Sequence, residues 1–477
     1  MNSEANRKPM SYGSLTTVIE FMDPNLRFLL SSRVPAIRSI EKNVPLRIDK
    51  LVFDDHRIEV NDTTYECEIH QMDCSTSKVP YQVSGINELN GRRTCDVDAF
   101  GVPDHITKAG GMLPGNDGVY EKNLFGDYDR QTLLTNEKRF EKLEQRLEVQ
   151  KKRRDQLLSF RPRSTRNFDS RKSQKTIDRA QERYFRFETN RTQDQDRIFT
   201  VNELKLLKNK ENQDLAIEYA NKRIDLMEKE LLPFKNKNDD TRPKFEIRVI
   251  KYKGYSSTIL ERVQYTGDLH KAVISLREFM FSKRRHAVAV KDLYIPQSCS
   301  IPMPRDLKMR ITSLALEKTV PTELVEPIID TSLPLKELYI RINHHAEQNL
   351  DHEFIGSSKL LKLNLVPDHM IPSISNLVNQ TVEIGLALPF LTDEQFVCLI
   401  RNWMVTGKPV GTSFTFRTGL IDEMAISLFD AVCDEIEEAT ANNGVLFIPI
   451  KNEAVLKISW NEENDVINIR MVVESLD

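Results

Sequence analysis

The 477-residue chain is long enough for two to four domains, taking about 150 residues per domain as a guide. Its formal net charge of -3, from 68 Lys and Arg against 71 Asp and Glu, excludes a protein that binds nucleic acid or membranes with its whole surface. Hydrophobic residues make up 39% of the chain and charged residues 29%, so some segments can build cores while others must stay solvated.

Residues 1–45 predict a small knot of helices. Apolar residues from Leu15 to Met22 follow the i, i+3, i+4, i+7 spacing of one helical stripe, and Asp23-Pro24 ends that helix. A second helix follows and ends before Pro35. The knot is either a docking surface for a protein partner or a cap on the strands that follow. The candidate docking residues, expected on one buried side, are Leu15, Val18, Ile19, Met22, Leu26, Leu29 and Leu30.

Residues 46–72 predict an antiparallel β meander, because apolar residues nearly alternate with polar ones and Asp54-Asp55 and Asn61-Asp62 supply turns. Residues 73–132 lose this periodicity and gain Gly, Asp, Asn and Pro. We expect a long, loop-rich segment there, without the composition of a folded core.

Residues 133–240 predict two charged helices joined by a polar connection. Each helix carries a short apolar seam, so the two are expected to pair as an antiparallel hairpin resembling a short coiled coil. Pro233 is expected to end the second helix. The seam residues are Phe140, Leu143 and Leu147 on the first helix and Ile217, Ala220, Ile224, Met227 and Leu231 on the second.

Residues 151–186 form a basic segment, with thirteen Lys and Arg against four Asp and Glu. One interpretation is a nuclear-import signal or a phosphate-binding face for nucleic acid. The other is a solvated helix end and linker, which charge runs usually form. The candidate basic patch consists of Lys151, Lys152, Arg153, Arg154, Arg161, Arg163, Arg166, Arg171 and Lys172.

Residues 241–289 predict a two-stranded hairpin around Lys253-Gly254, followed by a helix capped by Asp268. From residue 290 to the C-terminus, short apolar strands recur about every 20 to 33 residues, close to the period of leucine-rich repeats. This predicts an irregular leucine-rich-repeat-like β-α solenoid, in which Leu314, Leu338 and Leu363 share one buried column.

The last three apolar segments, "VLFIPI", "VLKISW" and "VINIRMVV", predict an antiparallel meander that closes the open edge of this solenoid. The fold class is therefore mixed, α+β and α/β. It combines a helical knot, a β meander, a charged helical arm and a C-terminal solenoid with its closing meander.

No pattern typical of a catalytic, cofactor or metal site is present, so we expect no enzyme activity and no cofactor. Cys67, His70, Cys74 and Cys95 are potential zinc ligands, but they lack the paired spacing of structural zinc sites. The segment "VTGKPVGTSF" lacks the first Gly and the Ser/Thr of a phosphate-binding loop.

An intracellular protein, cytoplasmic or nuclear, is expected. The six Cys are scattered, which is typical of reduced thiols rather than of a disulfide framework. No apolar run is long enough for a membrane span, and the first ten residues lack the apolar region of a secretory signal.

Two segments carry a resemblance to a known family. "SYGSLTTVIEFMDPNLRFLLSSRVPAIRSIEKNVPLRIDKLVF" is similar to its opening, and "ERVQYTGDLHKAVISLREFMFSKRRHAVAVKDLYI" is similar to its C-terminal half. The chain thereby resembles a nematode-expanded family of uncharacterised proteins, domain of unknown function 3557. That family has no established catalytic residues, so the resemblance implies none here.

The opening segment also resembles a degenerate F-box. Asp23-Pro24, Leu26-Arg27 and Ser32-Arg33 occupy the D/P, L and S-R positions of that motif, while its initial Leu-Pro is replaced. This resemblance implies binding to the ubiquitin-ligase linker Skp1.

These observations lead to one main hypothesis and one alternative. The main hypothesis is a non-enzymatic protein-interaction protein of the ligase-adaptor kind, whose solenoid recognises an unknown target and whose knot docks to the linker. The alternative is a nucleic-acid-associated protein that uses the basic segment 151–186, which steep salt dependence of binding would reveal.

Overall fold

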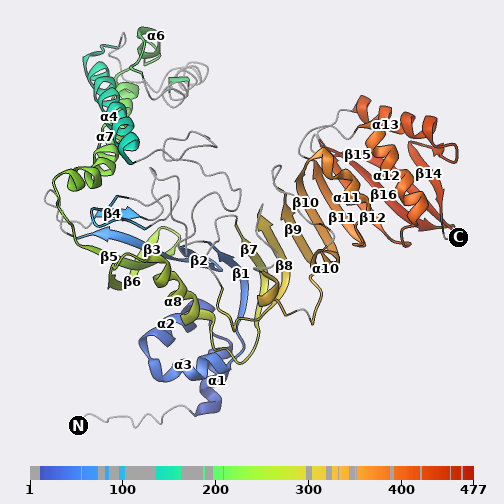
Figure 1. The fold of residues 1–477 in the computed structure, drawn as a ribbon, viewed down its shortest axis with the longest axis horizontal. Helices are drawn as coiled ribbons and strands as arrows, with labels where there is room; N and C mark the ends of the chain where they lie inside the picture. The colour runs from blue at the N-terminus through green and yellow to red at the C-terminus, as the bar shows by residue number, and fades with distance from the viewer. Residues whose placement is uncertain are drawn as a thin grey trace, which may run out of the picture.

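The computed structural model describes residues 11–54, 56–72, 81–84, 96–102, 136–162, 186–187, 197–207, 209–296, 303–317, 325–330, 332–342, 350, 352–386, 392–418, 422–451, 453–463 and 466–476. Their strands form one large, open, mixed sheet of 16 strands (Figure 1). Strands from both ends of the chain therefore share a single hydrogen-bonded layer.

Three short helices open the chain. α1 (Tyr12–Glu20) and α2 (Pro24–Arg33) confirm the two predicted helices, and α3 (Pro35–Asn43), which begins at Pro35, was not predicted. The Asp23 side chain caps α2 by accepting hydrogen bonds from the backbone N–H groups of Asn25 and Leu26. Proline begins both α2 and α3, where a missing N–H costs nothing. These caps explain three short helices in so few residues.

The predicted antiparallel meander is confirmed: β1, β2 and β3 pair in order. The sheet continues beyond β3 through β5 and β6, the predicted hairpin, and Gly254 takes a positive φ of 57° at its turn. Helix α8 packs on β3 and β5 through Val273 and Leu269. The bounds are β1 (Arg47–Phe53), β2 (Arg57–Val60), β3 (Thr63–Gln71), β5 (Phe245–Lys253), β6 (Ser256–Gln264) and α8 (Leu269–Phe281).

Most of the loop-rich segment 73–132 lies outside the described residues. One part of it, β4 (Tyr81–Ser84), is a strand that pairs with β3.

The two charged helices, α4 (Asn136–Ser159) and α7 (Lys210–Asn238), pair as the predicted antiparallel hairpin and project from the sheet (Figure 1). Leu143 and Leu147 of α4 cluster with Ile224, Met227 and Leu231 of α7. A short helix, α6 (Val201–Leu204), precedes α7.

The predicted end of the second helix at Pro233 is wrong, because α7 continues to Asn238 with Pro233 inside it. Proline in a helix removes one backbone hydrogen bond. Two contacts hold the last turn nevertheless. Phe234 is buried in the hairpin core, and the Asn236 side chain donates to the Phe100 carbonyl at 3.3 Å.

Six consecutive strands, β7 to β12, lie side by side in chain order and pair in parallel, which agrees with the predicted stacking. The N-terminal strand β1 continues this parallel run on the other side of β7. The bounds are β7 (Val288–Ile295), β8 (Met309–Glu317), β9 (Glu337–Arg341), β10 (Leu360–Val366), β11 (Thr381–Leu386) and β12 (Ser413–Thr418).

Short helices in the crossovers cover one face of these strands, and their apolar residues join the main core. They are η2 (Glu326–Ile328), α10 (Glu353–Gly356), η3 (Asp368–Met370), α11 (Ile371–Ser375) and α12 (Asp393–Thr406). The opposite face of the strands is therefore the one that carries the polar side chains.

The closing antiparallel meander is also confirmed. After α13 (Asp422–Glu435), strand β13 (Thr440–Asn442) pairs with β14 (Val445–Ile450), which continues into β15 (Ala454–Glu463) and β16 (Val466–Ser475). Strand β16 pairs antiparallel with β12 and covers the edge that the parallel run would expose.

The predicted buried column is correct for Leu314 and Leu338 but wrong for Leu363. The register places Leu361 beside Leu338, and Leu363 stands one row further along, beside Ile340. The reason is that buried residues do not strictly alternate along these strands. They follow the pattern apolar-x-x-apolar-x-apolar, as in Val290-Leu293-Ile295, Ile311-Leu314-Leu316 and Leu335-Leu338-Ile340.

We predict that Leu361→Ala lowers the free energy of unfolding by about 2–5 kcal/mol, because the side chain is fully buried and its loss leaves a cavity. Lys362→Ala is the matched control, since it faces the polar side and should cost at most about 1 kcal/mol. Chemical denaturation of both variants measures the difference. Equal losses would contradict the assignment of the two faces.

Candidate interaction surfaces

A buried group of charges joins the N-terminal helices to the sheet. Glu41 of α3 accepts hydrogen bonds from Arg27 of α2 at 3.1 Å and from Arg284, which follows α8, at 3.0 and 3.2 Å. All three side chains are at most 4% exposed. Arg27 also donates to the backbone carbonyls of Val44 and Pro45. Such a complete set of partners is what allows charges to be buried.

Lys42 adds a second connection at the same place. Its Nζ donates to the carbonyls of Phe279 and Met280, the last turn of α8, at 2.5 and 3.0 Å. Burial, followed by the nearby Arg284 charge, lowers the pKa of Lys42 to about 7. The last turn of α8 is thus capped by a residue more than two hundred positions earlier in the chain.

The seven candidate docking residues do not lie on one buried side, so that expectation is wrong. Ile19 is fully buried, Val18 and Leu26 are exposed, and Leu15, Met22, Leu29 and Leu30 are half-buried. The inward face of α2 is instead largely polar, and its apolar anchor is Phe28, which packs edge-on against Phe281. Phe28 is not among the predicted docking residues, because its apolar character is no different from that of the neighbouring leucines and only its packing on Phe281 distinguishes it.

Large apolar side chains remain exposed on the same three-helix unit. Phe21, just after α1, is 83% exposed, and Leu26 of α2 is 53% exposed. Tyr12, Val18 and Val34 are also exposed. A concentration of exposed apolar residues is typical of a protein contact surface.

The described part of the basic segment is mostly neutralised within the chain. Lys151 pairs with Glu228 at 2.8 Å, Lys152 with Glu148 at 3.4 Å and Arg154 with its neighbour Asp155. Arg161 is exposed. The other candidates, Arg163, Arg166, Arg171 and Lys172, lie outside the described residues.

Arg153 is not part of a basic surface, because its side chain is buried. Its Nε donates to the Arg197 carbonyl at 2.7 Å, and its guanidinium stacks over the Phe199 ring. Nearby, Leu157 is buried in a cluster with Phe187 and Phe199. Arg153 and Leu157 are therefore part of a small core, and the solvated interpretation is wrong for these two residues, whereas the exposed Lys152 and Arg161 agree with it.

The outward face of the parallel strands carries a row of paired charges. Lys362 on β10 lies between Glu337 on β9, at 2.9 Å, and Glu383 on β11, at 4.0 Å. These three side chains keep about a third of their surface exposed. Arg341 on β9 pairs with Glu317 on β8 at 3.5 Å. We call this polar side of β8 to β12, together with the adjoining β16, the open face.

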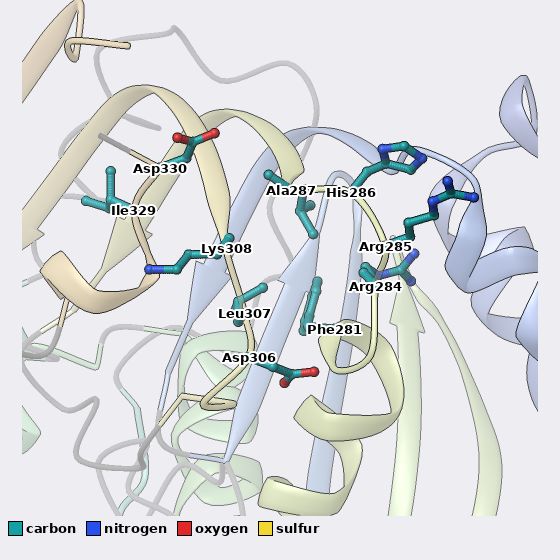
Figure 2. Close-up of a pocket in the computed structure, with 11 residues that line it drawn as sticks. Phe281, Arg284, Arg285, His286, Ala287, Asp306, Leu307, Lys308, Ile329 and Asp330 are labelled. Carbon is teal, nitrogen blue, oxygen red and sulfur yellow. The ribbon is translucent and has the colours of Figure 1, made fainter. Parts of the chain in front are cut away.

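A pocket of about 440 Å³ lies where α8 ends and β7 and β8 begin. Figure 2 shows charged side chains, among them Arg284, Asp306 and Lys308, around the apolar Phe281 and Leu307.

The charged groups of this pocket are largely occupied by the protein itself. Arg284 holds Glu41, and Asp306 accepts from the Ser282 hydroxyl. Lys308 donates to the Pro327 carbonyl at 2.6 Å. Arg284, Asp306 and Lys308 therefore connect the elements around the pocket to one another.

A chain of polar groups, buried at His56 and half-buried at His270 and Asp96, links the β1–β2 turn, α8 and residues 96–102. His56 Nε2 lies 2.9 Å from His270 Nδ1, and His270 Nε2 lies 3.2 Å from an Asp96 carboxylate oxygen. Asp96 also accepts hydrogen bonds from the Tyr265 hydroxyl and the Leu269 N–H. Burial, followed by the charges of His270 and Arg277, keeps the pKa of His56 well below its ordinary value.

Among the described residues, no group of three or more His, Cys, Asp or Glu is arranged to hold a metal ion. Cys74 and Cys95 lie outside those residues. Burial raises the pKa of the Cys67 thiol to about 12, which is far from that of a reactive thiolate. No helix in the described part of the chain has the length and apolar character needed to cross a membrane.

Comparison with protein families matches residues 268–419 to a domain of unknown function, DUF3557. The match begins at the cap of α8 and ends just after β12, so it covers the parallel strands β7 to β12. The resemblance to this uncharacterised domain family is thereby supported for that region. Comparisons with curated proteins and with solved structures find no match.

We predict that Glu41→Gln lowers the free energy of unfolding by about 3–5 kcal/mol, because two buried guanidinium groups lose their shared counter-charge. Glu20→Gln is the control, since its 4.0 Å pair with Arg47 is exposed and contributes at most about 1 kcal/mol. Urea denaturation at low salt compares the two. A loss below that of the control would show that the Arg27–Glu41–Arg284 group is dispensable.

The His56 pKa predicts acid sensitivity. The folded protein binds a proton on His56 less readily than the unfolded chain, whose ordinary pKa is 6.5. The stabilisation is therefore complete above about pH 6.5 and is lost as the pH falls below it. His56→Gln should flatten the pH dependence of the melting temperature between pH 7 and 5. Parallel curves for the variant and the wild type would contradict this assignment.

Proposed function

We propose that this chain is a non-enzymatic protein-interaction protein, in which the open face recognises a protein target and the N-terminal helices dock to a Skp1-type linker of a ubiquitin ligase. The observation that carries the proposal is the difference between the two faces of the parallel strands, one of which is apolar and buried and the other polar and accessible. One side is a continuous apolar core, and the other presents half-exposed charged and aromatic side chains from consecutive strands.

The strand pattern supports a leucine-rich-repeat-like solenoid. The buried apolar-x-x-apolar-x-apolar positions recur in β7, β8 and β9, and the strand starts are separated by roughly the 20–29 residues of such repeats. Solenoids of this kind present an extended surface made of parallel strands, which suits recognition of another protein.

The N-terminal helices support the docking part of the proposal. Three short helices with Asp23-Pro24 between the first two agree with the F-box-like interpretation. Phe21 and Leu26 are exposed apolar side chains of the type that a partner covers. The alternative role in nucleic-acid binding has less support, because most of the described basic residues are paired or buried. An intracellular location would follow from the adaptor role.

Direct binding to a purified Skp1-type linker tests the docking proposal. We expect the full chain to bind in isothermal titration calorimetry, and a Phe21→Asp, Leu26→Asp double variant to lose at least tenfold in affinity because both side chains lie on the exposed surface. Val405→Asp is the control, since this residue is 64% exposed on α12, which lies far from α1 and α2 (Figure 1), and it should leave binding unchanged. No binding by the unmodified chain would reject the adaptor role.

A further inference from the structure

We infer that the β12–β16 end of the open face binds an acidic, extended segment of a target protein, with Arg417 and Arg470 as the residues that hold its carboxylates. This inference rests on the proposed function and adds the chemistry of the target.

The first observation is an imbalance of charge along the open face. On β9 and β10 the cations Arg341 and Lys362 are neutralised by glutamates of neighbouring strands. On β12 and β16 the cations Arg417 and Arg470 are exposed, and neither has an ion-pair partner among the residues that the structure describes. Among the described strands of the open face, the arginines without an ion pair therefore lie at the β12–β16 end.

The second observation is the register that brings these two arginines together. Thr415 on β12 lies opposite Arg470, and Arg417 lies opposite Asn468. The alternating residues Phe414 and Phe416 are fully buried, so Thr415 and Arg417 stand on the open face. Arg417 and Arg470 are thus diagonal neighbours on one face, with Cα atoms about 7–8 Å apart.

This spacing matches a particular ligand geometry. In an extended peptide the side chains at i and i+2 point to the same side and lie about 6.5–7 Å apart. Two carboxylates at such positions would each face one arginine. Guanidinium groups favour this pairing because their planar fork can bind a carboxylate with two hydrogen bonds.

The third observation is the uncharged surroundings of Arg417 in the register. Its neighbour on β11 is Gly385, which has no side chain. The Asn364 side chain lies over this glycine, because a Cβ there would be 2.9 Å from the Asn364 side-chain oxygen. Its neighbour on β16 is Asn468, which is also uncharged. Neither register neighbour therefore neutralises Arg417.

The Asn364 side chain is held within the sheet. Its Nδ2 donates to the Tyr339 hydroxyl at 2.9 Å, and its oxygen accepts from the Leu365 N–H at 2.8 Å. Glu383, the acidic group closest in register to Thr415, shares Lys362 with Glu337 on the other side. The negative charge of Glu383 would repel an acidic ligand on the β11 side, so the proposed site is confined to the arginines of β12 and β16.

Fluorescence anisotropy with the full chain tests the inference. The probe is a labelled nonapeptide with Glu at alternate positions, and the comparison probes are the same peptide with Gln and a short single-stranded oligonucleotide. We expect the Glu peptide to bind at least tenfold more tightly than either comparison probe. Equal binding of the oligonucleotide would overturn the assignment to an acidic protein segment.

The variants locate the site. Arg417→Gln with Arg470→Gln should weaken binding of the Glu peptide at least tenfold, while replacement of both by Lys should restore part of it. Arg262→Gln on the exposed strand β6 removes an arginine elsewhere on the sheet and should change nothing. Circular dichroism and thermal melting confirm that each variant is folded.

The outcomes separate this inference from the proposed function. If the double Gln variant binds the Glu peptide as tightly as the wild type, or if the wild type does not bind it, the arginine site is rejected. The ligase-adaptor proposal still stands in that case if the chain binds the purified linker. That contact uses Phe21 and Leu26 of the N-terminal helices and not the C-terminal strands.

Discussion

The carboxylate of Glu41, shared between Arg27 and Arg284, is the interaction on which the arrangement of the sheet depends. It holds α2 and α3 against the end of α8. Backbone hydrogen bonds connect the same two segments, since the Arg285 N–H donates to the Lys42 carbonyl and the Ala289 N–H donates to the Leu46 carbonyl. These bonds place β1 beside β7 in parallel, although the two strands are far apart in the chain. Removing any one of these three charges would leave the others buried without a full set of partners, so the junction is costly to break.

The two faces of the parallel strands contribute differently to stability. The inward side chains of the parallel strands join one apolar core with the crossover helices, and changes there are costly. The outward side chains form ion pairs with side chains on neighbouring strands. Exposed ion pairs of this kind contribute little to stability. Residues on the open face can therefore differ without unfolding the protein, and this freedom suits a surface that must fit a particular partner.

Local patterns predicted most of the elements because their signals lie within a few residues. The helical spacing near Leu15, the turns of the meander, the seams of the charged helices and the parallel strand series all agree with the structure. The docking candidates were found less well. Leu26 has the same apolar signal as Phe28, yet only the packing of Phe28 against Phe281 decides which side of α2 turns inward.

By itself, the sequence determined most of the helices and strands, that the C-terminal strands stack in order, and that an antiparallel meander follows them, but it did not predict α3 or β4. Only the tertiary structure decided the alignment of Leu361 with Leu338, the burial of Arg153, and the meeting of Glu41 with Arg284 and of His56 with His270. The physical reason is distance along the chain. Periodicity records how each residue meets its neighbours, whereas strand register and buried charge pairs depend on partners that no local spacing identifies.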